Sequence, residues 1–163
     1  MVSRRLSGEA GHRRKFLAVV DNTPECERAI AYAARRARST GGAVVLLYVI
    51  ETADFQQWLG VEQIMREEAN AAAATTLDTH ASRVREQVGV EPELVVREGA
   101  ATQEIHRLIE EDQDIAILVL AAGSAKEGPG PLVTSVAGKG AAFPIPVTVV
   151  PAGLTDEEIE TLA

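Results

Sequence analysis

The chain has few aromatic residues, a single cysteine and no long apolar run. Only 4% of its 163 residues are aromatic although 46% are hydrophobic, so its core must be built mainly of Val, Leu, Ile and Ala. Cys26 is alone and cannot form an internal disulfide, which favours a reducing compartment. No apolar run approaches the ~20 residues of a membrane-spanning helix, and residues 1–15 lack the apolar centre of a secretory signal. We therefore expect a cytoplasmic protein without a membrane partner.

Positive charge is scarce outside the N-terminus. The formal net charge is −8, but five basic residues and one acidic residue give residues 1–15 a charge of +4, which leaves −12 for the rest. A body this acidic repels phosphate backbones, so we expect no nucleic-acid partner. Residues 1–15 are charged, contain Gly8 and Gly11 and show no periodicity, so they are predicted to form a disordered basic arm.

Five short apolar runs are typical of strands that are buried on both faces. They lie at residues 16–20, 43–50, 93–97, 115–122 and 147–150. Helical patterns separate them, near residues 23–40, 60–89, 102–111 and 134–142. This alternation predicts an α/β fold in which helices cover both faces of a five-stranded parallel sheet. The C-terminal tail, residues 152–163, has a capping-box spacing from Thr155 to Glu158 that predicts one or two helical turns.

Polar residues predict where the helices begin and which sides stay in solvent. Thr23 and Pro24 fit the N-cap and the first position of the first helix. Thr134 and Ser135 fit the start of the fourth helix. Arg35 is expected to stay in solvent, opposite the apolar face of its helix. In the longest helix, the apolar stripes of the two halves are rotated from each other, which predicts either a bend or a change of packing partner midway.

Residues 112–135 carry the strongest signal for a site. Their strand ends at Gly123, and the loop that follows contains Gly128 and Gly130 before the predicted helix start. A strand, a glycine-rich loop and a helix N-terminus can present backbone N–H groups to an anion at the carboxyl edge of a sheet. Pro129 and Pro131 oppose this, because they have no N–H and stiffen the loop.

The order and spacing of several features resemble the universal stress protein family. These features are a strand ending in Asp21, the strand 43–50, the Gly123-Ser124 turn, the run Ser135-Val136-Ala137 and a final PIPVTVVP. The resemblance covers about residues 15–151 and implies that residues 16–151 form one domain of this family. It also implies the sheet order 3-2-1-4-5 and a homodimer that pairs through Val147–Val150.

The resemblance further implies a nucleotide site, which some members of the family have. Asp21 matches the acid that contacts adenine, Val49 matches the residue beside it, and Gly123 matches the first glycine of the phosphate loop. Lys126 stands in place of the second glycine. Thr134 replaces the last one and comes two residues early. The loop is therefore degenerate in both residue type and length.

Two features offer a way to keep phosphate binding despite these departures. Gly128 and Gly130 allow a close approach of the backbone, and Lys126 can supply a positive charge. The residues expected to face the phosphates are Gly123, Lys126, Gly130, Ser135 and Val136. ATP with Mg²⁺ and AMP are therefore the candidate ligands.

We interpret the chain as a stress-response module of the cytoplasm that binds ATP or AMP, without strong catalytic activity because no general base is evident. A nucleotide-free homodimer that binds another protein is the alternative. A small hydrolase that uses the same crevice is a weaker one, because Ser124 and Ser135 have no obvious His–acid partners. No histidine, cysteine or carboxylate shows a metal-binding spacing, so no metal site is predicted.

Overall fold

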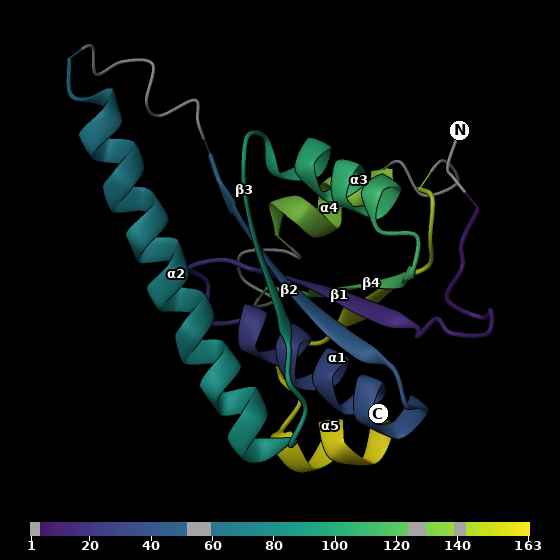
Figure 1. Ribbon diagram of the computed structural model, residues 1–163. Coiled ribbons are helices and arrows are strands. Elements are labelled where there is room, and N and C mark those ends of the chain that lie inside the picture. Colours follow the sequence, from purple (N-terminus) through teal and green to yellow (C-terminus); the bar gives the residue numbers. More distant parts are fainter. Residues whose placement is uncertain (1–3, 52–59, 124–129, 139–142) are drawn as a thin grey trace.

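The computed structural model of the protein describes residues 4–51, 60–123, 130–138 and 143–163 (Figure 1). Strands and helices alternate along them as predicted. The strands are β1 Lys15–Val20, β2 Ala43–Ile50, β3 Glu93–Glu98, β4 Ile115–Ala121 and β5 Val147–Val150. The helices are α1 Cys26–Thr40, α2 Glu62–Gln87, α3 Ala101–Glu111, α4 Pro131–Gly138 and α5 Asp156–Leu162.

All five strands run parallel in one sheet of order β3-β2-β1-β4-β5, which confirms the predicted topology. β1 lies at its centre, where Leu17 is in register with Val45 of β2 and Leu118 of β4. The chain leaves β1 toward β2 on one side and leaves β4 toward β5 on the other. This reversal between β1 and β4 is the switch point at which open α/β sheets form a crevice.

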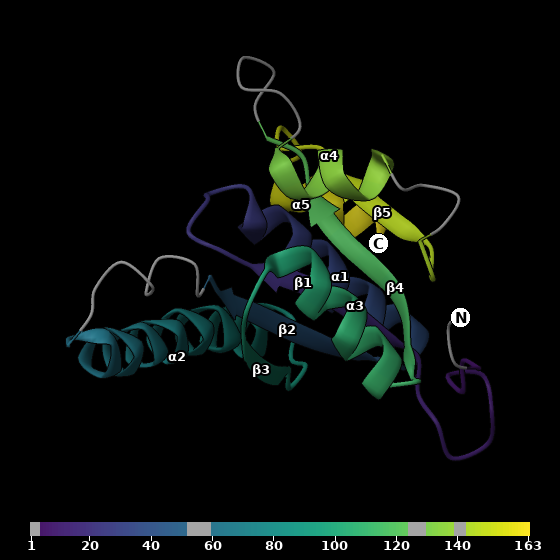
Figure 2. The same cartoon turned by 90° about the horizontal axis from the view of Figure 1, so that it is seen from above.

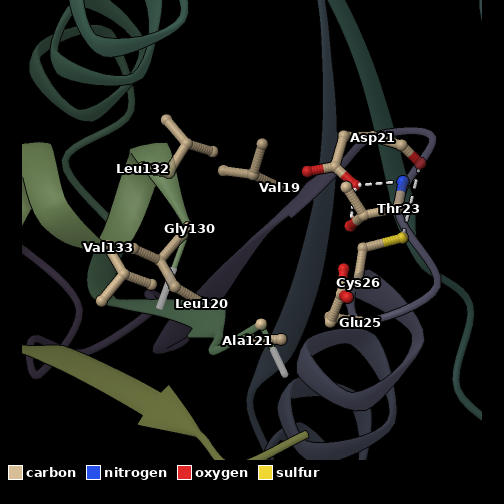
Figure 3. A pocket seen from close by; sticks show the side chains of 11 residues that line it. Val19, Asp21, Thr23, Glu25, Cys26, Leu120, Ala121, Gly130, Leu132 and Val133 are labelled. Atoms are coloured by element: carbon tan, nitrogen blue, oxygen red, sulfur yellow. Dashed lines mark hydrogen bonds between the residues drawn. The ribbon is translucent and has the colours of Figure 1, made fainter. Parts of the chain in front are cut away.

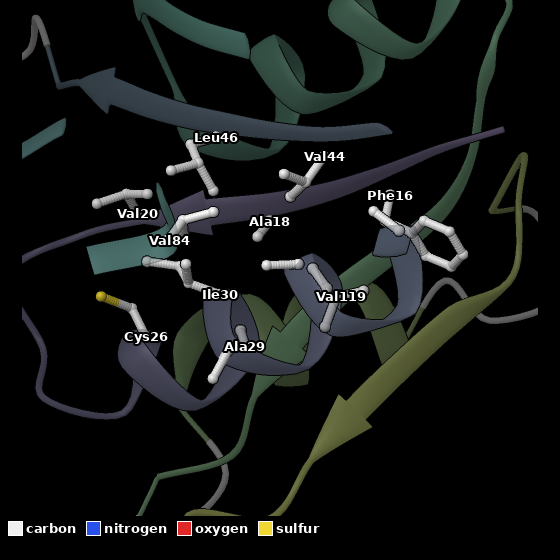
Figure 4. Close-up of a cluster of buried hydrophobic side chains, with 14 of the residues drawn as sticks. Phe16, Ala18, Val20, Cys26, Ala29, Ile30, Val44, Leu46, Val84 and Val119 are labelled. Atoms are coloured by element: carbon white, nitrogen blue, oxygen red, sulfur yellow. The ribbon is translucent and has the colours of Figure 1, made fainter. Parts of the chain in front are cut away.

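The central strand supplies side chains to two cores. Phe16, Ala18 and Val20 face one core, and Leu17 and Val19 face the other. All five are at most 6% exposed, and their alternation follows the two-residue period of a strand. Helices α1 and α5 cover the first face with the second half of α2, and α3 and α4 cover the second (Figure 1). Figure 4 shows the first core, into which α1 and α2 both insert side chains.

Helix α2 changes its packing partner along its length, which is one of the two predicted alternatives. Its second half inserts Leu77 and Val84 into the core that contains α1. Its first half extends beyond the body of the sheet (Figures 1 and 2), where Met65 packs against Ile50. On this half Ile64 is 57% exposed. The first apolar stripe therefore stays partly in solvent.

The start of α1 differs from the prediction. The helix begins at Cys26, and its N-cap position is occupied by Glu25, whose side chain makes no capping hydrogen bond. Thr23 and Pro24 lie in the preceding turn. Thr23 bonds to Asp21 instead of capping the helix, so its pairing with the end of β1 outweighs its capping preference.

Helix α4 also begins earlier than predicted, at Pro131 instead of Thr134. The N–H and the hydroxyl of Thr134 both donate to the carbonyl oxygen of Gly130, at 3.0 and 2.9 Å. Gly130 has a φ of +99°, a conformation that glycine adopts without strain. Proline at the first helical position loses no hydrogen bond there, so Pro131 starts the helix that the sequence analysis placed three residues later. The predicted end, residues 139–142, lies outside the described residues.

The described part of the N-terminal arm differs from the predicted disordered segment. The N–H of Leu6 donates to the carbonyl oxygen of Gln113 at 2.9 Å, and the Arg5 guanidinium donates to that of Ile109 at 2.7 Å. Arg5 also donates to the carbonyl oxygens of Asp112 and Ile115. A cation at the carbonyl end of α3 is favourable, which explains why this basic segment lies against the sheet.

The C-terminal tail forms the two turns of α5, as predicted. The hydroxyl oxygen of Thr155 accepts a hydrogen bond from the N–H of Glu158 at 3.2 Å, which confirms the cap. Ile159 is completely buried in the core that contains α1. The tail therefore belongs to the packed body of the domain.

Candidate functional site

A groove of about 730 Å³ lies at the carboxyl edge of the sheet. The ends of β1 and β2, the middle of α2 and the first turns of α3 and α4 line it. Asp21, Val49 and Ser135, all predicted site residues, are among its lining. Small-molecule sites occupy roughly 300–1,000 Å³, so the groove is large enough for a nucleotide.

A smaller cavity of about 90 Å³ adjoins the groove at the switch point between β1 and β4 (Figure 3). Gly123 and Gly130 line it, together with Asp21. Asp21, Val19 and Leu132 line both spaces. The structure thus brings the end of β1 and the two glycines after β4 together, although about a hundred residues separate them.

The Asp21 carboxylate is held in place by the turn that follows it. Its Oδ1 accepts hydrogen bonds from the N–H and the hydroxyl of Thr23, at 2.8 and 2.5 Å. In Figure 3 the other carboxylate oxygen points toward Val19, on the cavity side. Asp21 therefore offers a fixed acceptor to a ligand in the groove.

Two helix N-termini meet at the same place. The hydroxyls of Thr102 in α3 and Ser135 in α4 lie 3.4 Å apart and both line the groove. The first N–H groups of a helix have no acceptor within it, which applies to Thr102 in α3 and Leu132 in α4, and both of these residues line the groove. Such groups, together with the helix dipole, favour an anion.

Two predicted residues do not join this set. Val136 is 5% exposed and packs in the core beneath α3 and α4, lining neither the groove nor the smaller cavity. Neighbouring helical residues point about 100° apart, and in α4 Ser135 faces the groove while Val136 faces the core. Lys126 lies outside the described residues.

Other lining residues were missed by the sequence analysis. Among them are Tyr48 and Glu51 at the end of β2, Ala69 and Ala72 of α2, and Thr102 of α3. Thr102 had a usable signal, because it follows the carboxyl end of β3, where loops of a parallel sheet bind ligands. The alanines had none, since small residues on a helix usually mark packing.

Cys26 lies beside the smaller cavity, but it is only 4% exposed. Burial raises the pKa of its thiol to about 11. His80 lies 4.0 Å from the sulfur, and burial lowers the pKa of its imidazole, so it is neutral at pH 7 and does not stabilise a thiolate. This environment does not activate the thiol.

Neither a metal cluster nor a membrane span is found within the described segments. No three His, Cys, Asp or Glu side chains of residues 4–51, 60–123, 130–138 and 143–163 come together to hold an ion. None of the helices in those ranges is long and apolar enough to cross a membrane.

The five-stranded parallel sheet with helices on both faces defines an α/β domain, with a groove at the carboxyl edge of the sheet. The family model of the universal stress proteins matches residues 12–151. The chain belongs to the universal stress protein family. A search of curated proteins found no match.

Solved structures of universal stress proteins have the same fold. UspA from Lactobacillus plantarum is 18% identical, with 84% of this chain and 97% of that chain covered and a TM-score of 0.69. A universal stress protein in complex with cAMP is 15% identical to this chain. The match covers 86% of this chain and 98% of that chain, with a TM-score of 0.62. The universal stress protein from Archaeoglobus fulgidus in complex with dAMP is 20% identical. The match covers 84% of this chain and 97% of that chain, with a TM-score of 0.54.

Proposed function

We propose that this protein is a stress-response module of the cytoplasm that binds an adenine nucleotide, AMP or ATP, in the groove, without strong catalytic activity. One observation carries the proposal. A single groove holds the fixed Asp21 carboxylate and, near it, the first turns of α3 and α4 with their available N–H groups. The carboxylate suits the exocyclic amine of adenine, and the helix N-termini suit a phosphate.

The structural relatives support this proposal. Two of them, at 15% and 20% identity, are complexes with cAMP and dAMP, which are both adenine nucleotides with one phosphate. The position of Val49 next to Asp21 in the groove agrees with the adenine side that the family resemblance implies.

The described lining of the groove offers little for catalysis. Its titratable side chains are Asp21, Tyr48 and Glu51, and the Oδ1 of Asp21 is already bonded to Thr23. Ser135 has the hydroxyl of Thr102 beside it, which is not a base. We therefore expect hydrolysis of ATP, if measured, to be slow.

Thermal unfolding with AMP and GMP tests the proposal after any co-purified nucleotide has been removed. A ligand that binds only the folded protein stabilises it by about 2.7 kcal/mol at a hundred times its Kd. AMP is expected to raise the unfolding temperature. GMP is the matched control, because it presents a carbonyl where adenine has the amine, and we expect a smaller rise. No stabilisation by AMP up to millimolar concentration would contradict the proposal.

As a second proposal, we infer that the protein forms a homodimer, whether or not it binds a nucleotide. One specific feature of the structure favours this. β5 is an edge strand, and its Val149 is 44% exposed. An apolar cavity of about 350 Å³ lies beside it, lined by Val133, Val136 and Phe143 among others. Unpaired edge strands tend to pair with another chain. We propose that Val147–Val150 of two copies pair, and that the dimer is a platform for a protein partner.

A further inference from the structure

A separate cavity lies where α1, the second half of α2 and the start of α5 meet (Figure 1). Three arginines, Arg28, Arg35 and Arg83, are among its lining residues, and we call it the arginine cavity. Its volume of about 130 Å³ is several times the space that one water molecule needs. It shares no described lining residue with the groove or with the smaller cavity, so the proposed nucleotide function does not use it.

Helical spacing brings the basic side chains to this place. Arg28, Ala31 and Arg35 are three and four residues apart on α1, so they lie along one face of the helix. The short side chain of Ala31 lines the cavity between the two arginines and leaves room there. From α2, Arg83 and Gln87 are four residues apart and line the same space.

The three arginines keep hydrogen-bond donors for a ligand. A guanidinium has five N–H groups. With partners in the described part of the chain, Arg35 bonds through Nε and one Nη, Arg28 bonds through its two Nη atoms, and Arg83 bonds through one Nη. At most two of the five N–H groups are engaged in each case, so each guanidinium retains at least three.

The arginines are less exposed than the carboxylates that pair with them. The side chains of Arg35 and Arg28 are 8% and 20% exposed, whereas those of their partners Glu160 and Asp156 are 48% and 62% exposed. Ion pairs with exposed carboxylates contribute little, because water and salt screen them. A largely buried cation beside a cavity favours a further anion, which would compensate the cost of removing its charge from water.

The described lining of the arginine cavity has a positive balance. The three arginines stand against Glu27 and Asp156, and His80 is neutral at pH 7 because burial lowers the pKa of its imidazole. The carboxylate bonded to Arg35 is shared with Arg38, so counting both leaves four cations against three anions. The acidic charge elsewhere on the protein is largely screened beyond about 8 Å at physiological ionic strength.

We propose that the arginine cavity binds a small oxyanion of the kind represented by inorganic phosphate. Guanidinium groups bind phosphate oxygens through paired, charge-assisted N–H bonds, and here they come from two helices that face each other. The bound anion would link α1 to α2 on the side of the sheet that α5 covers. This site is independent of the nucleotide groove.

Calorimetric titration with inorganic phosphate, at pH 7 and constant ionic strength, tests the proposal. The helix N-termini at the groove are another place for phosphate, so the titration is made in the wild type and in Ala72→Trp. This change fills the groove, and Ala72 does not line the arginine cavity. We expect one phosphate site per chain that remains in Ala72→Trp.

Two variants of the lining connect this binding to the cavity. Arg83→Gln removes a charged donor, and Gln87→Glu adds a carboxylate of nearly the same shape. We expect each to weaken phosphate about tenfold, as for loss of a hydrogen bond to a charged group. Arg85→Gln and Gln63→Glu are the matched controls, because they make the same changes on α2 outside the cavity lining. All four side chains belong to exposed residues, so the variants should fold.

The possible results separate this site from the nucleotide site. Phosphate binding that disappears in Ala72→Trp would overturn the proposal, because the anion would then lie in the groove. Absence of phosphate binding at millimolar concentrations would overturn it as well. Equal weakening in Arg83→Gln and Arg85→Gln would also contradict it, since binding would then follow overall charge. A protein that binds phosphate as described but no AMP would retain this site and lose only the nucleotide function.

Discussion

Arg35 and Glu160 join the first helix to the last across 125 residues of sequence. The Nε of Arg35 donates to Oε2 of Glu160 at 2.5 Å, and its side chain is 8% exposed. A second donor group of the same guanidinium bonds to the carbonyl oxygen of Ala31 at 3.1 Å. Arg38 pairs with the other oxygen of Glu160. The sequence analysis placed Arg35 in solvent, and this prediction was wrong because α5 packs over it.

This pair predicts a specific loss of stability in acid. The hydrogen bonds from Arg35 and Arg38 lower the pKa of Glu160. A carboxyl group with a lowered pKa stabilises the folded state above its ordinary pKa of about 4.3, and this contribution disappears as the pH falls through the lowered value. Glu160→Gln should therefore be less stable at pH 7 and lose less stability between pH 5 and 3 in urea titrations.

Glu157→Gln is the control for this experiment. It removes the same charge from the same helix without removing a partner of Arg35. If Glu160→Gln and the wild type lose stability with the same slope between pH 5 and 3, the pair does not act as described.

Cys26 should be almost inert in the folded protein. With a pKa of about 11, about one thiol in ten thousand is ionised at pH 7, against a few per cent for a free cysteine. We expect a thiol reagent to react at least about a hundredfold more slowly with the native protein than with the urea-unfolded protein. Since Cys26 is the only cysteine, the absorbance change reports this site alone. Equal rates in the two states would contradict the buried position.

If two copies pair through β5, a single added charge on the exposed side of this strand should dissociate the proposed dimer. Val149→Lys places a cation on the exposed side of this strand and should convert the dimer to a monomer in sedimentation velocity runs. Leu94→Lys is matched to it, because Leu94 lies on the opposite edge strand and is 38% exposed against 44% for Val149. A wild type that stays monomeric at high concentration, or a dimer lost only in Leu94→Lys, would contradict pairing through β5.

Asp21 should determine recognition of the base. Asp21→Ala removes the acceptor for the adenine amine, and we expect adenosine to bind about tenfold more weakly, as for loss of a hydrogen bond to a charged group. Thr23→Val is the control, because it removes the hydroxyl bond to Oδ1 and keeps the carboxylate. We expect it to change the affinity less than about threefold. Adenosine affinity that is equal in Asp21→Ala and in the wild type would refute this role.

Much of the fold was predictable, because each strand of a buried parallel sheet forms a short apolar run in the sequence. The strand from residue 43 to 50 and the other four strands of the sheet lie where the apolar runs are. The start of α4 was misplaced although its signal was present. Gly130 and Pro131 are as good a start as Thr134 and Ser135, and local sequence alone did not decide between the two.

The predicted part of the candidate site came from the family resemblance and from the strand, glycine-rich loop and helix start at residues 112–135. Asp21, Val49 and Ser135 line the groove, and Gly123 and Gly130 line the smaller cavity. Val136 was assigned to the site through its neighbour Ser135, but helix geometry turns it into the core. Ala72 depends on where α2 crosses the sheet, which is a tertiary relationship that no local pattern records.

The central claim, that the groove holds the ligand, is tested most directly by filling it. Ala71 and Ala72 are both exposed on α2, but only Ala72 lines the groove. In calorimetric titrations with AMP we predict one site per chain in the wild type and in Ala71→Trp, and no detectable binding in Ala72→Trp. AMP binding that survives Ala72→Trp with unchanged affinity would contradict the account, because the nucleotide would then lie elsewhere.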